Sequence, residues 1–196
     1  MTVLQGRRVL LRPLGPNDYT AFAEVRSANV EWLTKWEPKR LPGQPDPAES
    51  FDAFVARCSA RQRERQLGTG YGFGIFVDGG FSGEINLSAV QRGPFQCGNI
   101  GYWVDRRRAG CGYCPESLVV LARFAFEELA LHRVQIAIVP RNQASRRVVE
   151  KLKVRCEGTA ISYLQINGEW EDHLQFAMIA DEWAVRANEL LHCWVL

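Results

Sequence analysis

The sequence has no long hydrophobic run, little histidine and no marked excess of charge of one sign. None of its apolar stretches reaches the roughly 18 residues that a membrane-spanning helix needs, so it predicts no membrane segment. The 24 lysines and arginines nearly balance the 22 aspartates and glutamates, which argues against a dedicated nucleic-acid-binding protein. No repeat or low-complexity linker is visible, so the 196 residues predict a single domain.

The six cysteines follow no regular spacing, and the chain begins with no apolar stretch of the kind that directs export. We therefore expect free thiols in a cytoplasmic protein. Cys111 and Cys114 form a C-x-x-C pair, but neither a second pair nor histidines at ligand spacing accompany them, so we expect no metal site. A redox role is a minor alternative, since the pair lies close to the expected start of a helix.

Hydrophobic periodicity predicts a mixed α/β domain with hairpins on either side of a strand–helix–strand unit. Asp78-Gly79 and Asn167-Gly168 are turn sequences typical of tight hairpins. The expected strands are residues 8–14, 71–77, 83–90, 99–104, 133–139, 154–166 and 169–179. The expected helices are residues 49–66, 115–129 and 142–152, with short helices between 16 and 35 and a short amphipathic one at 186–196.

Two polar patterns accompany these elements. In the strand 83–90, Glu84, Asn86 and Ser88 alternate with apolar residues through Ala89, which predicts one polar face and one buried face. The helix 49–66 carries four arginines between residues 57 and 65, and the simplest interpretation is a solvated face.

The most informative segment is Arg107-Arg108-Ala109-Gly110-Cys111-Gly112-Tyr113, which joins an expected strand directly to an expected helix. Glycines allow successive backbone N–H groups to point at one spot, and the helix dipole and the arginines add positive potential. The pattern predicts a cradle for a phosphate or pyrophosphate, with an ordinary strand–helix turn as the alternative. It is neither a P-loop nor a dinucleotide fingerprint, because G-K-[ST] and G-x-G-x-x-G are both missing.

A second candidate is Asn142-Gln143-Ala144-Ser145, which follows the strand that ends at Pro140. Asn142 can fix the strand end and donate its amide to a ligand. Ser145 can cap the following helix or offer its hydroxyl to a leaving group. The segment gains weight from its place after the strand–helix–strand unit.

Together these two segments resemble the acetyl-CoA-binding core of the GNAT acyltransferase superfamily, over residues 100–158. Residues 107–112 match its pyrophosphate signature, [QR]-x-x-G-x-[GA]. Ile100-Gly101-Tyr102-Trp103-Val104, the run 142–152 and Asn167-Gly168-Glu169-Trp170 are similar to the Rim-type ribosomal-protein-alanine N-acetyltransferases. The similarity extends over most of the chain and implies a domain core at about residues 7–183, followed by a C-terminal tail at 184–196.

The resemblance implies the GNAT fold, an α/β (α+β) arrangement with a central, mostly antiparallel sheet that splays where residues 103–104 part from the strand 133–139. It implies acetyl-CoA as the cosubstrate, with its pantetheine arm in the splay as an extra strand and its pyrophosphate on the loop. The residues expected to bind it are Trp103, Val104, Arg107, Arg108, Ala109, Gly110, Cys111, Gly112, Tyr113, Asn142 and Ser145. The implied reaction is direct attack by a primary amine, most simply the N-terminal α-amine of a ribosomal protein.

The sequence departs from the family at the positions that move protons. Asn99 stands where many relatives carry a glutamate base, and Val149 stands where many carry a tyrosine acid. Ser145 is then the expected acid, and Glu84 is the expected base through a water molecule, although a surface carboxylate is an equal alternative. Lys153 replaces a glycine that ends a helix in the left-handed conformation.

The acceptor side is harder to assign. Trp32, Trp36 and Tyr163 fall where Rim-type enzymes form the substrate groove, and we expect Trp36 and Tyr163 to contact the acceptor, although the tryptophans could equally be core residues. Other hypotheses are acetylation of a small amine such as an antibiotic, polyamine or amino acid, a non-catalytic acyl-CoA-binding module, and a ribosome-associated factor. The chain is expected to be a monomer or a homodimer, without membrane or nucleic-acid partners.

Overall fold

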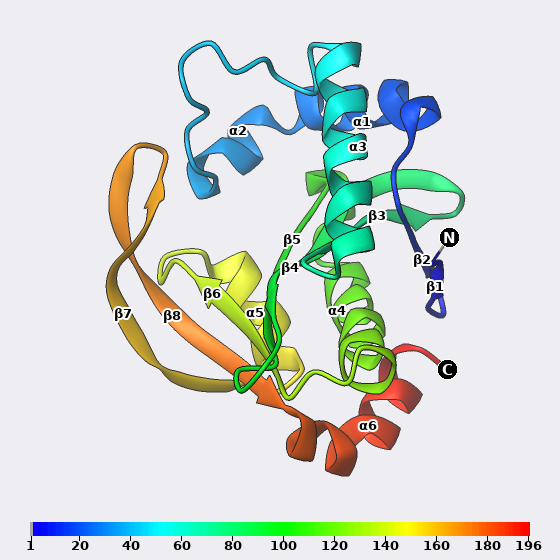
Figure 1. Ribbon diagram of the computed structural model, residues 1–196, viewed down its shortest axis with the longest axis vertical. Helices are drawn as coiled ribbons and strands as arrows, with labels where there is room; N and C mark the ends of the chain where they lie inside the picture. The colour runs from blue at the N-terminus through cyan, green and yellow to red at the C-terminus, as the bar shows by residue number, and fades with distance from the viewer. Residues whose placement is uncertain (1) are drawn as a thin grey trace.

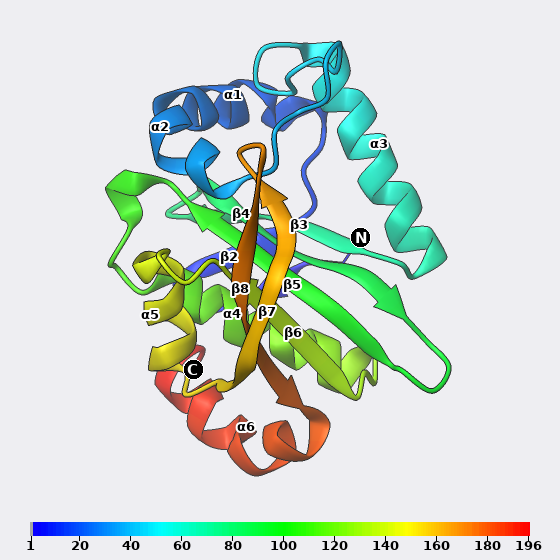
Figure 2. The same ribbon diagram turned by 90° about the vertical axis from the view of Figure 1, so that its left-hand side faces the viewer.

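An open eight-stranded sheet organises the fold, in the order β1-β2-β3-β4-β5-β6-β8-β7 (Figures 1 and 2). The computed structural model describes residues 2–196. The strands are β1 (Leu4–Gln5), β2 (Val9–Arg12), β3 (Tyr71–Val77), β4 (Gly80–Gln91), β5 (Cys97–Val104), β6 (Arg133–Ile138), β7 (Arg155–Ile166) and β8 (Glu169–Ile179). The α-helices are α1 (Tyr19–Ala28), α2 (Val30–Leu33), α3 (Phe51–Leu67), α4 (Tyr113–Arg123), α5 (Gln143–Lys151) and α6 (Ala180–Trp194).

The sheet is antiparallel except between β5 and β6, which run parallel. These two strands pair only over residues 97–99 and 133–135 and then part, so their facing edges have no strand between them. The expected mixed sheet and its splay beside Trp103 and Val104 are therefore confirmed. The splay matters because it leaves main-chain groups free in the middle of the sheet.

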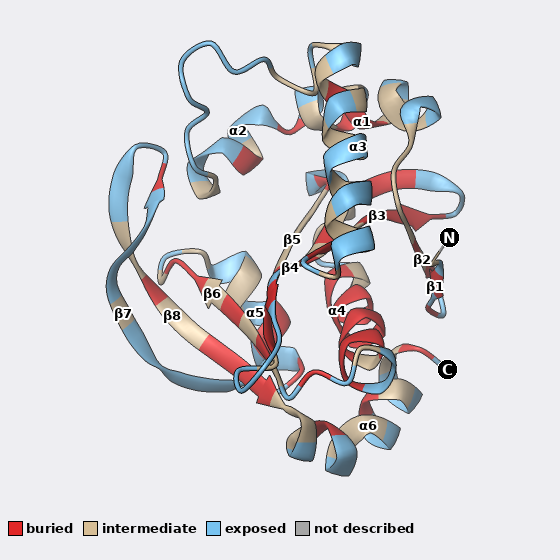
Figure 3. Ribbon diagram, in the orientation of Figure 1, coloured by how far each residue is buried: buried red, intermediate tan, exposed pale blue. Residues whose placement is uncertain are grey.

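Helices cover the two faces of the sheet to different extents. Helix α4 is buried along its length against one face, where Leu118 and Leu121 join Ile85 and Ile136 in the main core (Figure 3). On the other face, α1 and α3 form a smaller cluster around the fully buried Phe54. That second face is only partly covered, which leaves the polar side chains of β4 accessible.

The hairpin turns and one bulge set the register. Asp78 and Gly79, and likewise Asn167 and Gly168, have positive φ angles, as the tight turns predicted from these pairs require. Ala89 also has a positive φ, of 49°, and the register shifts between Ser88 and Gln91. The predicted alternation is therefore wrong at Ala89, which is exposed because this bulge turns the next residue inward instead.

Several boundaries differ from the sequence prediction. Strand β1 was not predicted, because two residues carry too little pattern to be recognised. Helix α6 begins at Ala180, six residues before the expected start, and the Glu182 carboxylate accepts the Ile179 N–H at 3.0 Å. Lys153 has a φ of 50°, so it takes the left-handed conformation expected of the glycine it replaces.

Within residues 2–196, no helix is both long and apolar enough to cross a bilayer.

Candidate active site

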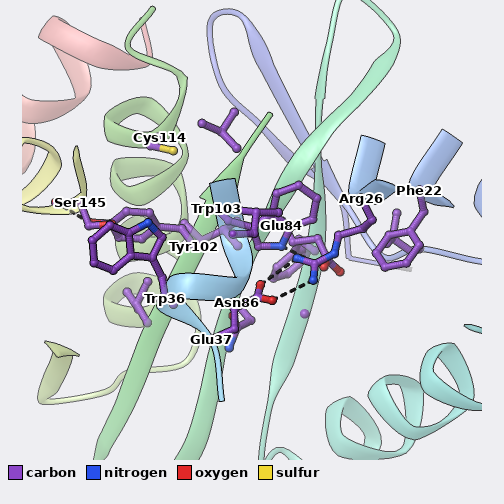
Figure 4. Close-up of a pocket in the computed structure, with 18 of the residues that line it drawn as sticks. Phe22, Arg26, Trp36, Glu37, Glu84, Asn86, Tyr102, Trp103, Cys114 and Ser145 are labelled. Atoms are coloured by element: carbon purple, nitrogen blue, oxygen red, sulfur yellow. Dashed lines mark hydrogen bonds and ion pairs between the residues drawn. The ribbon is translucent and has the colours of Figure 1, made fainter. Parts of the chain in front are cut away.

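A cavity of about 1600 Å³ opens at the splay and continues across the polar face of β4 and β5 (Figure 4). Its walls come from the start of α4 and of α5 on one side, and from α3 and the segment after α1 on the other. Pockets for a single small ligand usually measure about 300–1000 Å³. The cavity therefore has room for two substrates that meet near β5.

The loop before α4 forms the first part of the site. Gly110 and Gly112 have φ angles of 82° and 88°, and α4 begins at Tyr113. Among residues 2–196, no acceptor pairs with the backbone N–H groups of residues 110–114. A side chain at position 110 would meet nothing within 4 Å, so this glycine is not there to make room for packing. Free amides at a helix N-terminus are the arrangement that binds a phosphate group.

The cavity wall includes most, but not all, of the residues predicted in this loop. Arg108, Ala109, Gly110, Gly112 and Tyr113 line it. Cys111 does not line it. Arg107 also lies away from the cavity, because its guanidinium donates to Asp105 at 2.6 Å and 2.9 Å.

Asp105 anchors the start of the loop. Its carboxylate also accepts the Asn29 side-chain amide at 3.0 Å and the Arg107 backbone N–H at 3.1 Å. Burial raises the pKa of Asp105, but these hydrogen bonds outweigh it and hold the pKa below its ordinary value. The carboxylate is thus a fixed negative charge that orients the loop, while Gly110 and Gly112, whose N–H groups are free, line the cavity.

Glu116 anchors the other end of the loop. The sequence predicted the loop but not this role of Glu116. Its side chain is fully buried and accepts the backbone N–H groups of Arg8 and Val9 at 2.5 Å and 3.0 Å, and the Arg8 Nε at 2.8 Å. Arg8 also donates from Nη1 to the Cys111 carbonyl at 3.0 Å. This network ties the first turn of α4 to β2. The only sequence signal was a carboxylate at the start of an otherwise apolar helical stripe.

The start of α5 supplies Ser145. The Asn142 side chain caps this helix by accepting the Ser145 N–H at 3.2 Å, and the Tyr102 hydroxyl donates to the Ser145 carbonyl at 2.9 Å. Burial, with a smaller effect of Cys114, raises the pKa of Tyr102 well above its ordinary value, which keeps this hydroxyl protonated. The Ser145 hydroxyl itself has no hydrogen-bond partner within residues 2–196, and it lines the cavity. Capping therefore belongs to Asn142 and leaves the serine free.

Glu84 lies on the polar face of β4, inside the cavity. One carboxylate oxygen accepts Arg57 Nη2 at 2.6 Å, and the other accepts Trp103 Nε1 at 3.1 Å. The expected base is therefore a paired carboxylate rather than a free one. Asn99, by contrast, is absent from the residues that line the cavity.

The aromatic residues of the acceptor side divide into two groups. Trp32 and Trp36 are half-buried and line the cavity, so neither is a core residue. The guanidinium of Arg141, just before α5, lies 4.7 Å from the centroid of the Trp36 ring, so Trp36 is at the end of the cavity nearest α5. Tyr163, expected in the groove, does not line the cavity, and its ring contacts His173 edge-on at 5.6 Å.

The expected solvated face of α3 is wrong for three of its four arginines. Arg57, Arg61 and Arg65 line the cavity, whereas Arg63 is exposed. They follow one another at intervals of four residues, so they share the side of the helix that faces β3 and β4. This spacing was visible in the sequence, but nothing there showed that the helix would lie over a cavity.

The six cysteines include a C-x-x-C pair, a motif that can form a redox or metal site. All six are free thiols, and no group of three or more histidine, cysteine or acidic side chains is arranged to hold a metal ion in this part of the chain. Burial raises the pKa of Cys114 to about 12. A reactive thiol in a C-x-x-C pair needs a lowered pKa, so the redox alternative is disfavoured.

A free-amide loop at a helix N-terminus beside a splayed sheet is the arrangement that the resemblance implied. A family model for the acetyltransferase (GNAT) domain matches residues 8–155. The chain belongs to the GNAT acetyltransferase family. Members of this family use acetyl-CoA as the acyl donor, and the free amides of residues 110–114 with the open space around Gly110 fit its pyrophosphate.

Individual relatives cover nearly the whole chain of this acetyltransferase. The probable N-acetyltransferase YjcK of Bacillus subtilis is 31% identical over 179 residues, which are 90% of this chain and 97% of that protein. The [ribosomal protein uS5]-alanine N-acetyltransferase of Escherichia coli is 28% identical over 90% of each chain. The structure of Mycobacterium smegmatis RimJ in complex with CoA-disulfide has a TM-score of 0.87 and 31% identity, covering 98% of this chain and 92% of that one.

Proposed function

We propose that this GNAT acetyltransferase acetylates the N-terminal α-amine of a ribosomal protein in the cytoplasm. The observation that carries the proposal is the continuous cavity, which runs from the free amides of residues 110–114 to a groove lined by Trp32 and Trp36. A groove that continues beyond the splay suits an extended peptide whose N-terminus reaches the splay. The E. coli relative is named for the same kind of acceptor, an alanine of a ribosomal protein.

In this proposal the cofactor side binds the acyl donor mainly through backbone groups. The amides of residues 110–114 bind the pyrophosphate, and Arg108 adds positive charge at the cavity wall. The open edge of β5 beside Trp103 and Val104 offers main-chain hydrogen bonds to the pantetheine arm. When bound, acetyl-CoA supplies a thioester whose carbonyl carbon is open to attack by an amine.

In this proposal two side chains carry out the proton transfers of the reaction. Glu84, acting through a water molecule, takes the proton that the amine loses as its nitrogen forms the new C–N bond. The free hydroxyl of Ser145 gives a proton to the sulfur that leaves as the C–S bond breaks. Asn99 and Val149 have no group that titrates near neutral pH, so they take no part in these transfers.

The proposal is tested by calorimetric titration with acetyl-CoA, followed by thiol release with N-terminal peptides and small amines as acceptors. We expect acetyl-CoA binding and turnover on peptides. Turnover confined to a small amine would replace the peptide acceptor with that amine. Binding of acetyl-CoA without turnover on any acceptor would contradict the proposal.

The role of Glu84 has its own test. We expect Glu84→Gln to flatten the acidic limb of the pH dependence of kcat/KM, because the glutamine cannot accept a proton. An unchanged acidic limb would show that the carboxylate positions Arg57 and Trp103 only.

A further inference from the structure

The acceptor side of the cavity has more positive than negative charge. Its wall contains the carboxylates Glu37, Asp46 and Glu84, and each of them is already paired with an arginine of the same wall. The pairs are Arg26 with Glu37 at 2.7 Å, Arg57 with Glu84 at 2.6 Å, and Arg40 with Asp46. The pairing leaves no lining carboxylate for the two remaining arginines of this wall, Arg61 and Arg65.

Arg61 and Arg65 lie over β3 at Gly72. Arg65 donates from Nη2 to the Gly72 carbonyl at 2.8 Å, and its buried Nε has no acceptor within residues 2–196. A Cβ on Gly72 would lie 3.2 Å from Arg61 Cδ, so the missing side chain makes room for this arginine against the sheet. Arg61 forms an ion pair with Glu64 of the same helix at 3.0 Å, and Glu64 is not part of the cavity wall.

Strand register places these guanidinium groups at a defined distance from the reaction centre. Gly72 is opposite Asn86, which is opposite Gly101 on β5, next to Tyr102 and the splay. Two strand spacings amount to about 10 Å. An extended peptide spans that distance in about three residues.

We propose that the acceptor is an acidic peptide, whose third or fourth residue presents a carboxylate to Arg61 and Arg65. This inference rests on the proposed function, because it assigns the chemistry of the same acceptor beyond its terminal amine. Paired arginines prefer carboxylates, to which a guanidinium can donate two hydrogen bonds at once. A basic peptide would instead bring its positive charge close to Arg61 and to Arg65, and Arg65 has no carboxylate partner within residues 2–196.

The test compares three peptides of equal length that begin with alanine and differ only at positions 3 and 4, which carry glutamate, glutamine or lysine. We expect kcat/KM for the glutamate peptide to be about tenfold higher than for the glutamine peptide, mostly through a lower KM. The lysine peptide should be the poorest acceptor. The preference should weaken when the ionic strength is raised from about 0.05 M to about 0.5 M.

The variants Arg61→Gln and Arg65→Gln connect this preference to the two side chains. Each should lower the ratio of kcat/KM for the glutamate and glutamine peptides, and the double variant should bring it close to one. Arg63→Gln is the matched control, since it removes the same charge from the exposed side of α3. A general loss of folding would lower turnover of all three peptides and would not change their ratio.

The outcomes separate this inference from the proposed function. Equal turnover of the three peptides by the wild-type enzyme would overturn the acidic acceptor and leave peptide acetylation standing. A glutamate preference that Arg63→Gln abolishes, and that the other two variants keep, would also overturn it. Failure of every peptide, with acetylation of small amines, would overturn the proposed function and this inference with it.

Discussion

The cavity has a cofactor half, near the start of α4, and an acceptor half, below α3, and the two present different kinds of chemical group. In the cofactor half, the groups proposed to bind the donor are mainly backbone amides in one stretch of chain, at the start of α4. The acceptor half is made of side chains from α1, α3, β4 and the segment after α2, and each of its three carboxylates is held in an ion pair. A backbone cradle depends on glycines and a helix start, which a short motif can encode. A set of ion pairs between side chains forms only where the fold brings distant segments of the chain together.

This difference predicts how each half responds to mutation. A single change in the cradle should abolish donor binding, because several amides act on one group. A single change among the arginines of the acceptor half should alter preference between acceptors and leave donor binding intact. The following experiments test this contrast, from the largest expected effect to the smallest.

Gly110→Asp should weaken acetyl-CoA binding by at least about 100-fold. The new carboxylate would repel the pyrophosphate, and its backbone would be strained at a φ of 82°. Gly93→Asp is the matched control, because Gly93 also has a positive φ and open space around its Cβ but lies in another loop. Calorimetric titration of both variants makes the comparison, and micromolar binding by Gly110→Asp would contradict the cradle.

Glu116→Ala should lower the free energy of unfolding by about 3 kcal/mol, because it leaves the buried Val9 N–H, the part-buried Arg8 N–H and the Arg8 guanidinium without their acceptor. Glu128→Ala, at an exposed glutamate just beyond α4, should change it by less than about 0.5 kcal/mol. Urea denaturation gives both values. Equal effects of the two substitutions would show that the buried network contributes no special stability.

Ser145→Ala should lower kcat about 100-fold while changing acetyl-CoA affinity little, since it removes a proton donor and keeps the helix cap on Asn142. Ser27→Ala, on the exposed surface of α1, is the control. Steady-state thiol release and calorimetry separate the two effects. A variant with full kcat would leave Ser145 as a lining residue only.

Asp105→Asn should cost about 1 kcal/mol of stability at pH 7, because the neutral side chain loses charge-assisted hydrogen bonds from Arg107. The folded-state pKa of Asp105 is below its ordinary value of 3.8, so its contribution is complete above that pH. The contribution is lost as the pH falls through the lowered folded-state pKa. Urea denaturation at pH 7 and near pH 2 measures this, and a difference that persists at the lower pH would contradict the assignment.

The sequence predicted the cofactor half in some detail. The strand–loop–helix motif, the splay and the hairpin turns depend on local sequence or on a family pattern, and the structure has them all. Asn142 and Ser145 were both chosen as candidates, although their roles at the helix start were left open. The structure distinguishes them by giving the cap to Asn142.

The acceptor half could not be predicted in the same way. The α3 arginines were taken for a solvated face, because helical spacing says which residues share a side but not what that side covers. Glu84 was a candidate base, yet its pairing with Arg57 joins residues 27 positions apart. The Glu116 network spans more than 100 residues, from β2 to α4. Such contacts become visible only once the strands are in register.

The short junction between β5 and β6 gives the protein four sheet edges instead of two. The outer edges are β1 and β7, and the inner ones are β5 beyond Asn99 and β6 beyond Gln135. Exposed edges bind other strands readily, so the free enzyme has two unpaired strand edges, of β5 and β6, at the centre of its sheet. Acetyl-CoA bound between β5 and β6 would cover these inner edges and leave the outer edges exposed. Saturating acetyl-CoA should therefore slow amide hydrogen exchange in β5 and β6 and leave β1 and β7 unchanged.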